Sequence, residues 1–124
     1  MRILIADDER VIADSLALIF RAKEMEAIAV YSGESALELA ESWHPDFVIC
    51  DIVLGGMNGF EVATYIREHL PTCGIVLFSG HAATADLMFD AGEPGAQFDI
   101  LTKPVHPRVL LDYVLAHAHS STTR

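Results

Sequence analysis

The chain has 124 residues, of which 52% are hydrophobic, and a formal net charge of −10 at pH 7. This length fits one domain, because domains most often contain about 100–150 residues. The excess of acids argues against a nucleic-acid-binding domain, whose affinity rests on neutralising phosphates, and no apolar run reaches the ~18 residues of a membrane span. A strand pattern begins directly after Met1 with no signal-peptide pattern before it, so we expect a cytoplasmic protein.

Strand and helix patterns alternate five times, which predicts an α/β fold with a parallel sheet. The first strand covers the apolar run 3–6, and the first helix starts near Asp8-Glu9 with apolar residues at helical spacing. A second strand is predicted over 27–31, and Ser32 is placed to N-cap a second helix that ends before Pro45. The buried faces predicted for these two helices are Ile12, Leu16, Ile19 and Phe20, and Ala36, Leu37 and Ala40.

The second half of the chain continues the alternation around one irregular segment. Its predicted elements are strands over 46–51, 75–78 and 98–101, a helix from Asn58 through Leu70, a short helix over 84–91, and a last helix after Pro107. The segment 92–96 holds two glycines and a proline, which is typical of turns. The buried residues predicted here are Phe60, Ala63 and Ile66, and Val109, Leu110, Tyr113, Val114 and Ala118. We expect one domain over 1–119 and a disordered tail over 120–124.

Each of four apolar runs is followed by polar side chains that can carry chemistry. The first leads into Asp7-Asp8-Glu9, and the others lead into Asp51, Ser79 and Lys103. Because ligands bind at the carboxyl ends of the strands in an open parallel sheet, we expect these groups to lie together. Carboxylates packed together repel unless a cation neutralises them, and Mg²⁺ takes a few carboxylates while keeping several waters. The sequence therefore predicts a magnesium site at this edge of the sheet.

Over roughly Arg2 to Ala118, the chain resembles the receiver domain of two-component response regulators, because its polar motifs follow one another in the order found in that family. The matching motifs are Asp7-Asp8, Asp51 with the loop Leu54-Gly55-Gly56-Met57-Asn58-Gly59, Ser79-Gly80, and Lys103-Pro104. Each is common by itself, but all four in order, each after an apolar run, are highly specific. The resemblance implies a doubly wound, flavodoxin-like three-layer sandwich, whose five parallel strands have the order 2-1-3-4-5.

The resemblance also implies a signalling function within a phosphorelay. Asp51 would be the phosphoacceptor, supplied by a histidine kinase or a phosphotransfer protein, and Ser79 and Lys103 would bind phosphoryl oxygens. Mg²⁺ would be held by Asp7, Asp8, Asp51 and the carbonyl of Val53. Such a receiver acts on a downstream protein target, and it is no enzyme beyond self-phosphorylation and slow self-dephosphorylation at Asp51.

Several positions depart from the family pattern. Gly55 stands where a proline is usual, and Ile100 stands where an aromatic side chain usually couples the site to the output face. The spacing from Ser79 to Lys103 is about two residues longer than usual, judged against short αβ loops. By resemblance, Val53 and His81 flank the water that hydrolyses the phosphoryl group. Because Val53 offers no hydrogen bond, we expect a long-lived phosphorylated state, although a neutral imidazole at His81 can partly compensate.

Three other functions were weighed against this one. A phosphohydrolase with an aspartyl nucleophile needs a second acid two residues later to protonate the leaving group, and Val53 stands there. A flavin carrier needs a phosphate-cradling loop after the first strand, where the acids 7–9 would repel a phosphate. The third is a degenerate receiver that binds a partner without phosphorylation. The intact set of site residues argues against it, but Ile100 and the irregular segment with 92–96 keep this alternative open.

Overall fold

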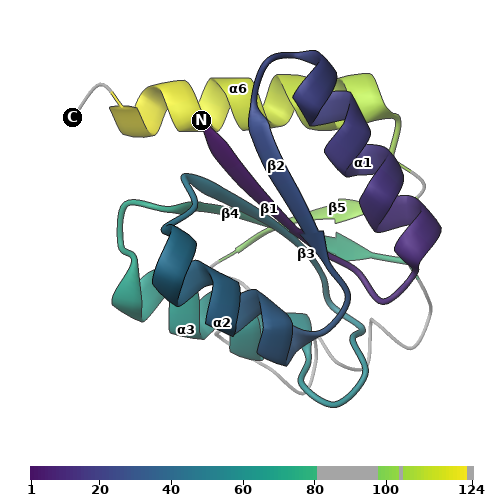
Figure 1. Ribbon diagram of the computed structural model, residues 1–124, viewed down its shortest axis with the longest axis vertical. Coiled ribbons are helices and arrows are strands. Elements are labelled where there is room, and N and C mark those ends of the chain that lie inside the picture. Colours follow the sequence, from purple (N-terminus) through teal and green to yellow (C-terminus); the bar gives the residue numbers. More distant parts are fainter. Residues whose placement is uncertain (81–97, 104, 123–124) are drawn as a thin grey trace.

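A five-stranded parallel sheet lies at the centre of the fold (Figure 1). The computed structural model describes residues 1–80, 98–103 and 105–122, with side chains through residue 117. The strands are β1 (Arg2–Ala6), β2 (Glu26–Val30), β3 (Phe47–Asp51), β4 (Gly74–Ser79) and β5 (Asp99–Thr102). Their order is β2-β1-β3-β4-β5, and every neighbouring pair is parallel. The strand order implied by the resemblance is confirmed.

Helices cover both faces of the sheet, which makes a three-layer sandwich. In the described part of the chain they are α1 (Arg10–Ala22), α2 (Gly33–Trp43), α3 (Gly59–His69) and α6 (Pro107–Thr122). Figure 1 shows α1 and α6 on one face of the sheet and α2 and α3 on the other. None of the helices in the described residues has the length and apolar character of a membrane span.

Two hydrophobic clusters form the core, one on each face. Ile3 and Ile5 of β1 belong to the cluster with α1 and α6, whereas Leu4 and Ala6 belong to the cluster with α2 and α3. Successive side chains of a strand point to opposite faces, and both faces are covered. This is why the strands read as continuous apolar runs and not as an alternating pattern.

Local capping signals set the helix boundaries as the sequence indicated. Ser32 accepts a hydrogen bond from the Ser35 N–H at the start of α2. Asn58 and Glu61 form a reciprocal capping box at the start of α3, with distances of 3.0 and 3.1 Å. The predicted N-caps are therefore confirmed, and α2 ends with His44 in the left-handed conformation at φ 52°.

Other predicted boundaries and faces differ from the structure. Helix α1 starts at Arg10, just after the expected start at Asp8-Glu9, because the backbone N–H of Glu9 donates to the Asp7 carboxylate. The second strand is shifted by one residue, since Arg2 pairs with Glu26. The prediction that Val109 is buried is wrong.

Val109 is 54% exposed, because the inward face of α6 is taken by Leu110, Leu111 and Val114. Helix α6 also continues to Thr122, past the predicted domain boundary at 119. The predicted short helix 84–91 and turn 92–96, and the side chain of Ala118, lie outside the described residues.

Candidate functional site

Three carboxylates gather at the carboxyl edge of the sheet. Asp7 follows β1 and Asp51 ends β3, and these two strands are neighbours with Ala6 paired to Cys50. One oxygen each from Asp7, Asp8 and Asp51 lies within 4.8 Å of the others. Asp7 and Asp51 are only 1% and 5% exposed, whereas Asp8 is exposed. The fold thus brings together the acids that the sequence placed at strand ends.

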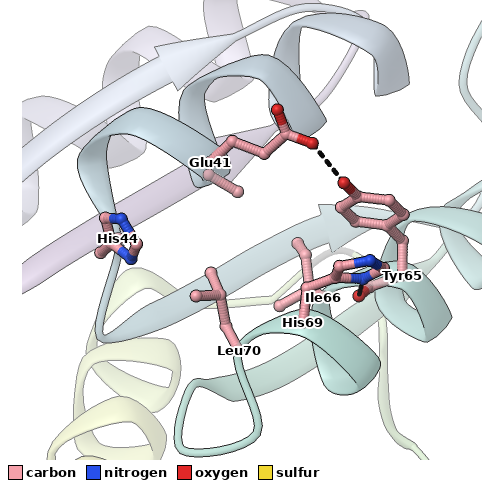
Figure 2. A pocket seen from close by; sticks show the side chains of 7 residues that line it. Glu41, His44, Tyr65, Ile66, His69 and Leu70 are labelled. Atoms are coloured by element: carbon pink, nitrogen blue, oxygen red, sulfur yellow. Dashed lines mark hydrogen bonds between the residues drawn. The ribbon is translucent and has the colours of Figure 1, made fainter.

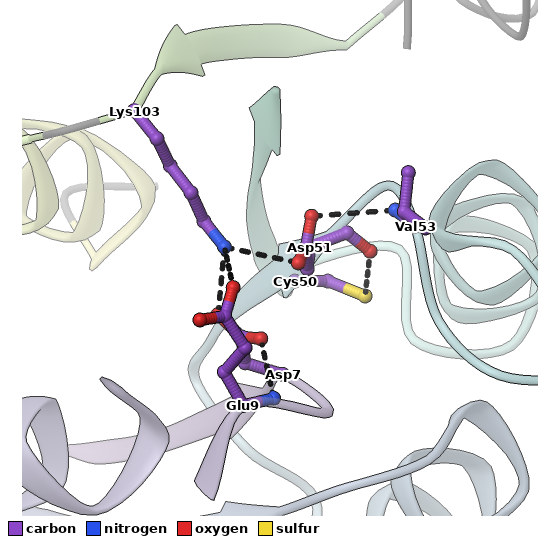
Figure 3. Close-up of polar contacts among 6 residues, drawn as sticks. All are labelled: Asp7, Glu9, Cys50, Asp51, Val53 and Lys103. Carbon is purple, nitrogen blue, oxygen red and sulfur yellow. Dashed lines mark hydrogen bonds and ion pairs between the residues drawn. The ribbon is translucent and has the colours of Figure 1, made fainter. Parts of the chain in front are cut away.

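Lys103 supplies a positive charge to this cluster (Figure 3). Its Nζ donates to Asp7 Oδ2 and to Asp51 Oδ2, at 3.0 Å in each case. Glu9 Oε1 lies 3.7 Å from the same nitrogen. The Lys103 side chain is 16% exposed and those of Asp7 and Asp51 are 2% and 7% exposed, so these two ion pairs are shielded from water on most sides.

The end of β4 positions Lys103. The backbone N–H of Lys103 donates to the carbonyl of Ser79 at 2.8 Å, which places the two residues side by side. A Cβ at Gly80 would lie 3.0 Å from Lys103 Cδ. A small residue after Ser79 therefore leaves room for the lysine side chain to reach the acids.

Burial shifts the pKa values of Asp7 and Lys103 in opposite directions. Desolvation raises the pKa of Asp7 above its ordinary value, and the hydrogen bonds from Glu9 N–H and Lys103 offset this only in part. Burial lowers the pKa of Lys103, but the hydrogen bonds and charges of Asp51 and Asp7 outweigh it, so the net shift is upward. Lys103 is therefore firmly charged, and it faces an excess of carboxylates.

The donor set fits a hard divalent cation. All three clustered side chains offer carboxylate oxygens, which are the ligands Mg²⁺ prefers, and the exposed Asp8 leaves a side open for the waters that Mg²⁺ retains. Val53 lies next to the cluster, and its N–H donates a hydrogen bond to Asp51 Oδ1 at 3.3 Å. The roles of the Val53 carbonyl and of the Ser79 hydroxyl stay predictions.

A close backbone contact holds the loop after Asp51. The N–H of Gly59 donates to the Ile52 carbonyl at 2.8 Å, which brings the start of α3 against the end of β3. A Cβ at Gly59 would lie 2.4 Å from the Asp51 carbonyl oxygen and 2.8 Å from Ile52 Cα. Sequence reasoning matched Gly59 to a loop motif but missed this contact, because nothing in the sequence gives the distance.

One pocket lies beside the acidic cluster, and another lies far from it. One, of about 430 Å³, adjoins the cluster and is lined by Glu9, Ile12, Leu16, Phe78, Gly80, Lys103 and Val105. Another, of about 290 Å³, lies between α2 and α3, where Tyr65 donates to Glu41 and stacks on His69 (Figure 2). Its residues include the C-terminal ends of both helices, which precede the next strands. It therefore lies at the edge of the sheet opposite Asp51.

Two of the positions that depart from the family pattern, Gly55 and Ile100, lie in the part of the chain that the structure describes. Ile100 of β5 is half-buried and packs against the cluster that includes α2 and α3. An aliphatic side chain in that place has no ring to rotate. His81, Pro104 and the segment 92–96 lie outside the described residues.

Comparisons with known proteins agree with this arrangement. A family model described as response regulator receiver domain matches residues 3–115. The DNA-binding response regulator MtrA of Mycolicibacterium paratuberculosis is 31% identical over 115 residues, which are 93% of this chain and 50% of that protein. The cell cycle response regulator CtrA of Brucella ovis is 29% identical over 124 residues, 100% of this chain and 51% of that protein. The chain thus spans about half the length of these relatives.

Solved structures show the same fold. A CheY-like response regulator receiver domain protein from Methanospirillum hungatei superposes with a TM-score of 0.86 at 26% identity, covering 98% of this chain and 96% of that one. NtrX from Brucella abortus superposes with a TM-score of 0.82 at 27% identity, covering 98% of this chain and 27% of that one.

Proposed function

Since this chain belongs to the response regulator receiver domain family of two-component signalling, we propose that its Asp51 carboxylate accepts a phosphoryl group from a histidine kinase or a phosphotransfer protein. The single observation that carries the proposal is the pairing of the buried Asp51 with Lys103 at 3.0 Å, beside the other two carboxylates of the cluster. Attack on a phosphoryl group brings one anion onto another, so the site must supply positive charge. Lys103 is a compact charge already within reach of the reacting oxygen.

In the proposed reaction a carboxylate oxygen of Asp51 attacks phosphorus. The new P–O bond forms an acyl phosphate, the P–N bond to the donor imidazole breaks, and the electron pair leaves on the imidazole nitrogen. Lys103 pairs with one phosphoryl oxygen and the Ser79 hydroxyl donates to another. Asp7 and Asp8, with Asp51 and the Val53 carbonyl, would hold Mg²⁺, which neutralises charge on the transferring group when bound.

The chemistry proposed is limited to this chain's own carboxylate. A phosphohydrolase that turns over external esters needs a proton donor near the leaving group, and Val53 cannot act as one. Receiver domains pass their state to effector domains or separate proteins, and the relatives named above include a DNA-binding regulator of about twice this length. We therefore place the output of this chain in a downstream protein target and not in direct nucleic-acid binding by an acidic domain.

The test is incubation with acetyl phosphate, with and without Mg²⁺, followed by intact mass measurement. Wild type should gain the mass of one phosphoryl group only when Mg²⁺ is present, and Asp51→Asn should gain none. Asp46→Asn is the matched control, because Asp46 precedes the same strand at its other end and binds the Arg2 N–H. A phosphoryl mass on Asp51→Asn would show that the acceptor lies elsewhere.

A second function is favoured by one observation. The half-buried Ile100 stands where family members usually have an aromatic side chain, which couples the phosphorylation site to the output face. Its absence at this position favours a receiver that binds its partner without phosphorylation. The two functions differ in one measurable respect. Partner binding that is equal for wild type and Asp51→Asn would support the phosphorylation-independent module.

A further inference from the structure

Lys103 interacts with three acids, and only two of them belong to the candidate metal cluster. Asp7 and Asp51 each accept a hydrogen bond from Nζ at 3.0 Å. Glu9 lies 3.7 Å away, which is ion-pairing distance but too long for a hydrogen bond. An ammonium has three N–H donors, so one of them remains after the two hydrogen bonds to Asp7 and Asp51.

Within residues 1–80, 98–103 and 105–117, Lys103 is the partner seen for the Glu9 carboxylate. Glu9 occupies the N-cap of α1, yet its side chain makes no capping hydrogen bond. Its backbone serves the helix start instead, since the carbonyl accepts from Ile12 and Ala13 and the N–H donates to Asp7 Oδ1. The Glu9 side chain is 58% exposed, so most of its surface faces water.

The position of Lys103 limits access to the acidic pair. Its ammonium occupies Oδ2 of both Asp7 and Asp51, and a divalent cation that takes these residues as ligands must compete with it for their oxygens. A lysine that gives up part of those contacts needs another anion nearby. Of the three described acids that pair with Lys103, Asp7 and Asp51 belong to the clustered metal ligands and Glu9 does not.

We propose that Glu9 is a positioning residue that draws the Lys103 ammonium away from Asp7 and Asp51 and so opens these carboxylates to a divalent cation. This inference rests on the proposed function, because it concerns the cation and the lysine of the same site. It gives the third acid of Asp7-Asp8-Glu9 a role separate from that of a metal ligand.

The experiment is calorimetric titration with MgCl₂ of wild type, Glu9→Gln, Lys103→Met and the double variant. Glu38→Gln is the matched control, because it removes the same charge from an exposed position in α2. Glu9→Gln should weaken Mg²⁺ binding about two- to fivefold, the size expected for loss of one surface ion pair. Lys103→Met should strengthen binding, since it removes the competing ammonium.

The double variant decides whether Glu9 acts through Lys103. In the Lys103→Met background, Glu9→Gln should change Mg²⁺ affinity no more than Glu38→Gln does. An equal loss of affinity with and without Lys103 would mean that Glu9 attracts the cation directly, and the inference would be wrong. It would also be wrong if Glu9→Gln matched Glu38→Gln in the wild-type background.

Failure of this inference can be told apart from failure of the proposed function. If Glu9→Gln behaves like Glu38→Gln while wild type binds Mg²⁺ and gains a phosphoryl group on Asp51, the proposed function stands alone. If wild type neither binds Mg²⁺ nor gains that mass, both are overturned.

Discussion

Substitution of Gly59 by alanine should destabilise the fold, because the added methyl group has no space. Its carbon would lie 2.4 Å from the carbonyl oxygen of Asp51 and 2.8 Å from Ile52 Cα, and these are backbone atoms that cannot rotate away. Overpacking of this kind costs about 1–3 kcal/mol. Replacing glycine also removes freedom from the unfolded chain, which returns about 0.4–1 kcal/mol.

With an overpacking cost near the upper end of its range, the net loss in the free energy of unfolding is ~2 kcal/mol. This corresponds to a drop in Tm of about 6–10 °C for a domain of this size. Gly55→Ala provides the matched control in the same loop, because a Cβ there meets nothing within 4 Å. Its φ is not in the left-handed region, whereas that of Gly56 is. Gly55→Ala should therefore raise Tm by about 1–5 °C, from the unfolded-state effect alone.

The assay is urea unfolding followed by far-UV circular dichroism, together with a thermal melt, on metal-free protein. The reasoning fails if Gly59→Ala unfolds at the same urea concentration as wild type, or if Gly55→Ala loses as much stability as Gly59→Ala. A change in the slope of the urea transition would point to an altered unfolded state and not to the contact.

Three further predictions concern the acidic cluster. Mg²⁺ at about ten times its Kd should stabilise wild type by roughly 1.4 kcal/mol through mass action, with a smaller rise in Tm for Asp8→Ala; an unchanged melting curve for wild type would speak against the site. Burial raises the pKa of Asp7, so the folded state favours the protonated carboxyl. The stability that this carboxyl contributes is therefore present below its ordinary pKa of 3.8 and is lost as the pH rises through its pKa in the folded state. Asp7→Asn should therefore raise the metal-free Tm more at pH 7 than at pH 4, and an equal effect at both would contradict this. Val53→Asn should shorten the lifetime of phosphorylated Asp51, because it replaces a water-excluding side chain with one that can hold water, and slower decay would refute that reason.

The sequence predicted the sheet and the acidic edge because both follow from short-range patterns. Runs such as 46–51 are apolar throughout, which indicates strands buried on both faces, and the parallel arrangement then brings Asp7 and Asp51 to one edge. The N-caps at Ser32 and Asn58 are equally local, since each bonds a backbone N–H three residues later.

What could not be predicted depends on packing between elements. Val109 and Leu110 are both apolar neighbours, and only the seating of α6 on the sheet decides that Leu110 is buried and Val109 exposed. Three acids in a row are equivalent in the sequence. It is the start of α1 at Arg10 that leaves Glu9 facing Lys103 and separates its position from those of Asp7 and Asp8.

The ion pair between Lys103 and Asp7 joins residues 96 positions apart in the chain, and this separation has a consequence for synthesis. A ribosome delivers β1 and β3 long before β5, so Asp7 and Asp51 emerge while their lysine has yet to be made. Such distant pairings form slowly and late, since the intervening chain must first be closed into a loop. Under the proposed function, a nascent chain gains the Lys103 charge that phosphoryl transfer needs only when its last strand has joined the sheet.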